Sequence, residues 1–91
     1  MTEKGWKNFL KFVQATNDPK MLSELLDLFL TPEEKASIET RCLIVKALLE
    51  QKLTQREMSK HLTVSIAKIT RGSNELKRIS PKLLAFLREN L

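Results

Sequence analysis

The sequence contains few residues of the kinds that bind metals, form cross-links or shape catalytic loops. Its 91 residues include one cysteine, Cys42, one histidine, His61, and two glycines. A single cysteine excludes an internal disulfide, and together with one histidine it cannot complete a structural zinc site. No GxSxG, HExxH or glycine-rich phosphate-binding motif occurs. We therefore expect no metal and no enzymatic activity, and a reducing, cytoplasmic setting. His61 is expected in a surface or turn position.

Long apolar runs are also absent. The longest stretch without Asp, Glu, Lys or Arg is His61–Ala67, which has seven residues. A transmembrane helix needs about 20 apolar residues and a signal peptide needs an uninterrupted apolar core, so we expect neither membrane insertion nor export. The chain length allows one small domain, residues 1–91, which buries only about 60–65% of its unfolded surface. That small core favours oligomerisation.

Positive charge is confined to one segment of the chain. The formal net charge is +5, and residues 1–51 sum to −1, residues 52–78 to +5 and residues 79–91 to +1. A local cationic field of this kind attracts a polyanion, most often nucleic acid. A solvated basic face without a partner has the same signature, so charge alone leaves both interpretations open.

The apolar periodicity predicts helices throughout, with no alternating strand pattern. The expected N-caps, each a Ser, Thr or Asp before a helical run, are Asp18, Thr31, Thr54, Ser65 and Ser80. Glu34 and Glu57 follow Thr31 and Thr54 at the spacing of a capping box. The sequence therefore predicts an all-α chain of six helices.

Two apolar helices indicate which surfaces are buried, one against a second copy of the chain and one in the core. The helix expected over Pro19–Leu30 is apolar around most of its circumference, so it must be buried on several sides, which favours a second copy of the chain. The following helix, to about Glu50, has a stripe formed by Ile38, Cys42, Val45 and Leu49. We expect this stripe in the core with Cys42 as a packed thiol, Arg41 half-buried beside it, and Trp6 as the core anchor of the first helix.

The segment Thr54–Gly72 has the layout of a helix-turn-helix. Small Ser59 lies where the two helices must approach, and Thr63 stands where such a turn usually has glycine. Three residues, Leu62, Val64 and Ile69, are expected to wedge the helices together. The second helix is expected to face inward through Ile66, Ile69 and Leu76. Plain helix packing and DNA binding both fit this layout, and the confined positive charge favours DNA binding.

Four sequence blocks resemble the Trp repressor family. They are Leu30-Thr31-Pro32-Glu33-Glu34, Thr40-Arg41, Leu53-Thr54-Gln55-Arg56-Glu57 and Ile69-Thr70-Arg71-Gly72-Ser73-Asn74. The resemblance covers about Leu28–Leu91. It implies an intertwined, all-helical homodimer that binds double-stranded operator DNA with L-tryptophan as corepressor. In that arrangement residues 1–50 form the dimerisation helices, residues 54–76 the reading head and residues 80–91 the C-terminal helix.

The resemblance also implies a tryptophan site. Its matching positions are Leu28, Leu30, Thr31, Arg41, Arg71, Gly72 and Glu75. In the family two arginines, here Arg41 and Arg71, sandwich the indole, Arg71 and Thr31 bind the carboxylate, and carbonyls at Leu28 and Leu30 of the partner bind the ammonium. Taken singly, Arg41 would be a surface arginine and Arg71 a phosphate contact. Glu75 replaces a small residue of the family, and it either pairs with Arg71, which we slightly favour, or attracts the ammonium.

For DNA, the resemblance assigns two kinds of contact. Arg56 matches a position that reaches a guanine, whose O6 and N7 suit an arginine fork. The start of the recognition helix is matched by Ile66, Ala67, Lys68 and Thr70. Positions on backbone phosphates are matched by Gln55, Ser73, Asn74 and Lys77. Lys68 and Ser65 replace smaller residues, and Ser59 stands where the family can have a phosphate-binding lysine. A constitutive helix-turn-helix or helical interaction module without an amino-acid ligand remains the alternative function.

Overall fold

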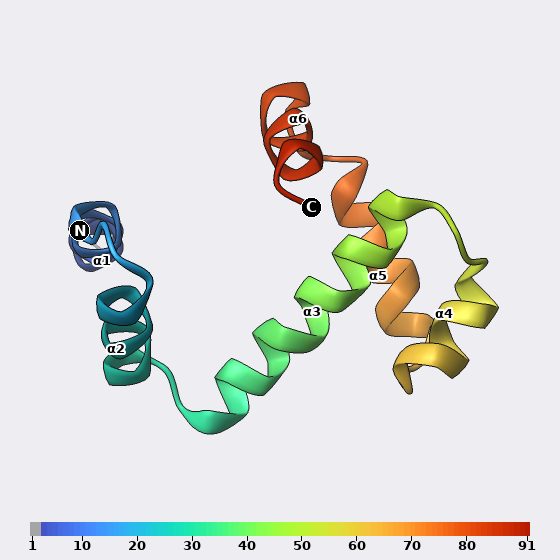
Figure 1. Cartoon of the computed structure of the whole chain (residues 1–91), viewed down its shortest axis with the longest axis horizontal. Helices are drawn as coiled ribbons and strands as arrows, with labels where there is room; N and C mark the ends of the chain where they lie inside the picture. Colours follow the sequence, from blue (N-terminus) through green and yellow to red (C-terminus); the bar gives the residue numbers. More distant parts are fainter. Residues whose placement is uncertain (1–2) are drawn as a thin grey trace. The chain divides into compact units, whose positions relative to one another are not determined.

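The computed structural model describes residues 3–91, and these form the six expected helices with no strand among them (Figure 1). The helices are α1 (Glu3–Ala15), α2 (Pro19–Phe29), α3 (Pro32–Glu50), α4 (Gln55–Leu62), α5 (Ile66–Leu76) and α6 (Pro81–Glu89). The prediction of an all-α chain is confirmed. No helix within residues 3–91 is long and apolar enough to cross a bilayer.

Side-chain caps fix where the helices begin, as their local sequences predict. Side-chain oxygens of Asp18, Ser65 and Ser80 each accept the backbone N–H three residues later, at 2.9–3.2 Å. Thr54 accepts from the Glu57 N–H at 3.1 Å while the Glu57 carboxylate accepts from the Thr54 N–H at 2.8 Å. Hydrogen bonds to the Glu57 carboxylate, first from the Thr54 backbone N–H and then from the Thr54 side chain, lower the pKa of this carboxyl.

The chain divides into two compact units, residues 1–35 and residues 36–91. In the first, α1 and α2 pack through an aromatic cluster: Phe9 meets Phe29 edge-on with centroids 5.3 Å apart, and Trp6 stacks on Phe9 at 5.4 Å. No side chain of α1 or α2 is buried. Trp6 is 61% exposed, so the expectation of a core anchor is wrong for the single chain, because α1 buries none of its side chains.

The second unit contains the hydrophobic core. It is formed by Ile44 of α3, Met58 of α4 and Ile69 of α5, each at most 3% exposed. Five half-buried residues pack around it: Ala47, Leu48, Leu53, Leu62 and Val64. The core therefore holds the two short helices against the C-terminal half of α3.

The face that α3 buries differs from the predicted stripe. Ile44, Ala47 and Leu48 face the core, whereas Ile38 is 49% exposed and Cys42 is exposed. Arg41 is exposed rather than half-buried. The reason is that α3 has apolar residues on more than one side, so its periodicity does not select a face, and α4 and α5 contact only its second half.

The turn between α4 and α5 is tight although it lacks glycine. Thr63 adopts the left-handed conformation, with φ 57° and ψ 48°, as the helix-turn-helix pattern requires of this position. The Ser59 carbonyl accepts the N–H groups of both Thr63 and Val64, and the Ser59 hydroxyl donates to the Val64 carbonyl at 2.5 Å. Half-buried Ser59 therefore stabilises the turn through both its carbonyl and its hydroxyl. The sequence suggested only that this residue had to be small.

Candidate nucleic-acid and ligand sites

The α4–α5 pair presents one buried and one exposed face. Met58 and Ile69 hold the pair to α3, while the first turn of α5 consists of exposed Ile66, Ala67 and Lys68. Ile66 is 48% exposed, so the expectation that it faces inward is wrong. The first turn of α5 thus exposes one apolar, one small and one cationic side chain to solvent. Such side chains suit contacts to base edges and to phosphates of DNA.

The expected base-reading arginine lies on α4. Arg56 is exposed on the first turn of this helix, within the capping box of Thr54 and Glu57 that fixes the helix start. Its guanidinium makes no ion pair within residues 3–91. A free, exposed arginine fork at this place fits a bidentate contact to guanine.

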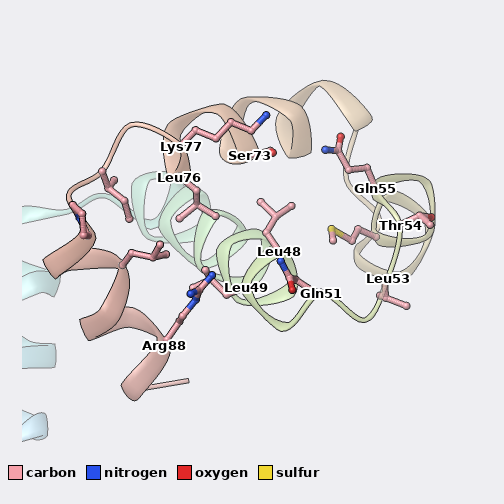
Figure 2. A pocket seen from close by; sticks show the side chains of 14 residues that line it. Leu48, Leu49, Gln51, Leu53, Thr54, Gln55, Ser73, Leu76, Lys77 and Arg88 are labelled. Atoms are coloured by element: carbon pink, nitrogen blue, oxygen red, sulfur yellow. The ribbon is translucent and has the colours of Figure 1, made fainter.

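Three of the four expected phosphate positions line one groove of the second unit (Figure 2). Gln55 comes from the start of α4, and Ser73 and Lys77 come from the end of α5. The groove encloses about 750 Å³ and has an apolar floor that includes Leu48 and Leu76. Figure 2 shows Ser73, Lys77 and Gln55 above this floor, so two helices contribute polar donors to the same rim. Asn74, the fourth position, is exposed and does not line the groove.

A side-chain hydrogen bond joins Gln55, which lies on this rim, to α5. The Thr70 hydroxyl of α5 donates to the Gln55 side-chain oxygen of α4 at 3.1 Å. Both residues were expected to contact DNA, but their mutual contact was not predicted. They are 15 residues apart, and only the packed helix pair brings them together.

The expected ligand arginines lie on two helices that approach closely. A Cβ added to Gly72 of α5 would lie 3.0 Å from Ile44 Cγ2 of α3, so this glycine permits the contact between the helices. Arg71 is the neighbour of Gly72, and Arg41 lies three residues, about one helical turn, before Ile44. Both arginines are exposed, and neither makes an ion pair in the described part of the chain.

Glu75 does not take the partner that we favoured from the sequence. Its carboxylate pairs with Arg78 at 3.6 Å, in an i,i+3 arrangement, and not with Arg71. Both side chains of the pair are more than half exposed. An arginine preceding glutamate by four residues is the poorer orientation on a helix, which agrees with the choice of Arg78.

The residues expected to bind the ammonium, and Thr31 as one of the two residues expected to bind the carboxylate, belong to the first unit. In a continuous helix each carbonyl accepts the N–H four residues later. For the Leu28 carbonyl that residue is Pro32, which has no N–H. For the Leu30 carbonyl it is Glu34, whose N–H donates to the Thr31 hydroxyl oxygen at 3.1 Å instead. No backbone hydrogen bond within residues 3–91 ends on either carbonyl. The Thr31 hydroxyl keeps its proton for a ligand. The local sequence thus leaves two acceptors and one donor available at the end of α2.

These features define a class of protein: an all-helical chain with a helix-turn-helix whose exposed face is basic. A sequence model of the Trp repressor protein matches residues 4–91. The chain belongs to the Trp repressor family. The match begins well before Leu28, where the resemblance seen in the sequence blocks began.

Three relatives show how far the similarity extends, and each is named as a Trp operon repressor homolog. The chain is 48% identical to the protein of Chlamydia caviae over 86 residues, covering 94% of this chain and 85% of the relative. It is 43% identical to that of Chlamydia trachomatis serovar D over 89 residues, covering 98% and 95%. It is 37% identical to that of Pasteurella multocida over 86 residues, covering 94% and 84%. The family is one of transcriptional repressors and not of enzymes, which supports the prediction of a repressor.

Proposed function

We propose that this protein is a transcriptional repressor that binds a near-palindromic operator as a homodimer when L-tryptophan is bound. The family match over residues 4–91 carries this proposal, and the exposed reading face of α4 and α5 supports it. Arg56, with the first turn of α5, reads bases, while Gln55, Ser73, Asn74 and Lys77 bind phosphates and fix the register. A repressor acts where the DNA is, so we place the protein in the cytoplasm.

Exposed apolar surface supports the homodimer. In the first unit Trp6, Phe12 and Met21 are each more than half exposed, and Leu28 is 77% exposed. Covering these residues with a second copy removes them from water. The helices of residues 1–50 would then form the dimer, residues 54–76 the reading head, and residues 80–91 the C-terminal helix. Sedimentation at micromolar concentration is expected to show a dimer, and a folded monomer would contradict it.

The proposed tryptophan site combines groups with chemistry suited to an amino acid. Arg41 and Arg71 are free of ion pairs in the chain described, so their planar guanidinium groups are available for an aromatic ring and a carboxylate. The Thr31 hydroxyl adds a donor, and the carbonyls of Leu28 and Leu30 in the partner copy would accept from the ammonium. Tryptophan would favour the form with both heads about 34 Å apart.

The decisive experiment uses the unmodified protein. It measures tryptophan binding without DNA, and then the effect of tryptophan and of operator DNA on each other's affinity. Calorimetry with L-tryptophan in the absence of DNA is expected to show binding. Because the linkage is reciprocal, operator DNA must raise the affinity for tryptophan by the factor by which tryptophan raises the affinity for operator. Operator binding that is equally tight with and without tryptophan would support the constitutive module instead.

A further inference from the structure

The hydrogen bond between Thr70 and Gln55 connects the recognition helix to the first residue of α4. It is the only side-chain to side-chain hydrogen bond between α4 and α5 among the described residues. In a helix, a threonine hydroxyl commonly bonds to a carbonyl of its own preceding turn. Here it donates to Gln55 instead, at 3.1 Å. The hydroxyl is therefore engaged before any DNA is present.

The direction of this bond decides what the Gln55 side chain offers to a partner. Its carbonyl oxygen accepts from Thr70, so the amide NH₂ at the other end of the planar group keeps both of its protons. Gln55 lies on the groove rim with Ser73 and Lys77, which are also donors (Figure 2). The rim thus presents an amide, a hydroxyl and an ammonium. This donor set suits an anion and not a cation.

The backbone at the same place adds donors. Thr54 satisfies the N–H groups of Glu57 and Met58 through its hydroxyl and carbonyl. The N–H groups of Gln55 and Arg56 have no helical acceptor, because they lie in the first turn of α4. An oriented Gln55 amide therefore stands beside backbone donors at the positive end of the helix dipole.

We propose that Thr70 acts in operator binding as a positioning residue: its hydroxyl holds the Gln55 carboxamide so that the NH₂ group faces a DNA phosphate. This inference rests on the proposed function and refines it, because Thr70 was expected to contact DNA itself. A glutamine side chain loses rotamer freedom when it is ordered by a ligand. Because the bond to Thr70 already orders the Gln55 side chain, DNA binding costs less conformational entropy.

A double-mutant cycle tests the proposal. The probe is a duplex that the unmodified protein enriches from a random DNA pool in the presence of L-tryptophan. Thr70→Val keeps the shape and removes the hydroxyl, and we expect it to weaken binding to this duplex about fivefold. In a Gln55→Ala background the same substitution is expected to have no further effect. Thr70→Ser, which keeps the hydroxyl, is expected to restore the affinity.

Three results would overturn the proposal. An equal loss from Thr70→Val in both backgrounds would show a direct contact of Thr70 with DNA. Full affinity of Gln55→Ala would show that this amide binds no phosphate. Failure of the unmodified protein to enrich any duplex would overturn the proposed function together with this inference, whereas additive losses would overturn the inference alone.

A second measurement needs no DNA and separates positioning from general stability. Nitrogen relaxation of the Gln55 side-chain NH₂ is expected to show an ordered amide in the unmodified protein and in Thr70→Ser. In Thr70→Val the amide is expected to become mobile, while the amide of Asn74, an exposed neighbour on α5, keeps its mobility. An unchanged Gln55 amide in Thr70→Val would contradict the proposal even if DNA binding fell.

Discussion

The two compact units of the chain differ in what they bury. Helices α1 and α2 contain no buried side chain, and Phe29 and Leu28 at the end of α2 are 48% and 77% exposed. Residues 36–91 bury Ile44, Met58 and Ile69 in a core and carry exposed lysine and arginine side chains on their surface. A segment with apolar surface and no core depends on a partner, whereas a segment with its own core can keep its shape while it reads DNA. The difference supports the proposal that the first unit serves assembly and the second recognition.

The largest expected effect compares two apolar side chains of equal exposure. Phe29 and Ile66 are each 48% exposed, but we expect only Phe29 to be covered by the second copy. Phe29→Ala is expected to lower the free energy of unfolding by about 3–5 kcal/mol and to dissociate the dimer. Ile66→Ala is expected to change it by about 0.5 kcal/mol or less. Chemical denaturation at two protein concentrations measures both, and equal costs would remove the distinction between the units.

The next effect concerns the ligand site. Arg71→Ala is expected to abolish tryptophan-dependent operator binding and to weaken tryptophan binding by about 2–5 kcal/mol, because a charged partner of the carboxylate is lost. Arg41→Ala is expected to do the same through the other face of the indole. The control is Arg78→Ala, which removes an exposed arginine that is paired with Glu75. Calorimetry that gives all three variants the same tryptophan affinity would contradict the assignment.

Within the reading head, base contacts and phosphate contacts are expected to behave differently. Arg56→Ala is expected to cost about 1–3 kcal/mol on the operator and to relax the preference at one guanine. Lys77→Ala is expected to weaken binding to all duplexes alike and to reduce the salt dependence by about one unit. Titrations against operator and scrambled duplexes at several salt concentrations measure both. Identical behaviour of the two variants would refute the division into reading and positioning residues.

Backbone conformation gives a smaller effect that stays within the second unit. Thr63 and Gln51 both have positive φ, at 57° and 56°, but Thr63 is β-branched and is therefore the more strained. Thr63→Gly is expected to raise the free energy of unfolding by about 1 kcal/mol, and Gln51→Gly by less. Thermal unfolding at a fixed protein concentration compares the two. A stabilisation that is larger for Gln51→Gly would show that Thr63 is not strained.

Local features of the fold could be predicted from the sequence because they depend on neighbours along the chain. The caps at Asp18, Thr54 and Ser80 each join residues three apart. The buried face of α3 could not be predicted, because the helix is apolar on several sides. Ile44 is buried and Cys42 exposed only because of where α4 and α5 pack.

The same limit applies to the sites. The reading-head residues could be assigned only from their match to the family blocks, one position at a time, and these assignments stay predictions. Contacts between distant residues could not, because they exist only after α4 and α5 pack, as for Thr70 with Gln55. The partner of Glu75 could not be predicted either, because two arginines lie within one turn of it.

The smallest expected effect is at Glu75. Since its carboxylate pairs with Arg78 at 3.6 Å and both side chains are exposed, Arg71 is already free for the ligand. Exposed pairs contribute about 1 kcal/mol or less, so Glu75→Ser is expected to change the affinity for tryptophan by less than about fivefold. Calorimetry with the variant, with Arg78→Ala as the matched loss of the same pair, measures this. A large tightening in Glu75→Ser alone would mean that Glu75 competes for Arg71, and a large weakening would mean that it holds the ammonium.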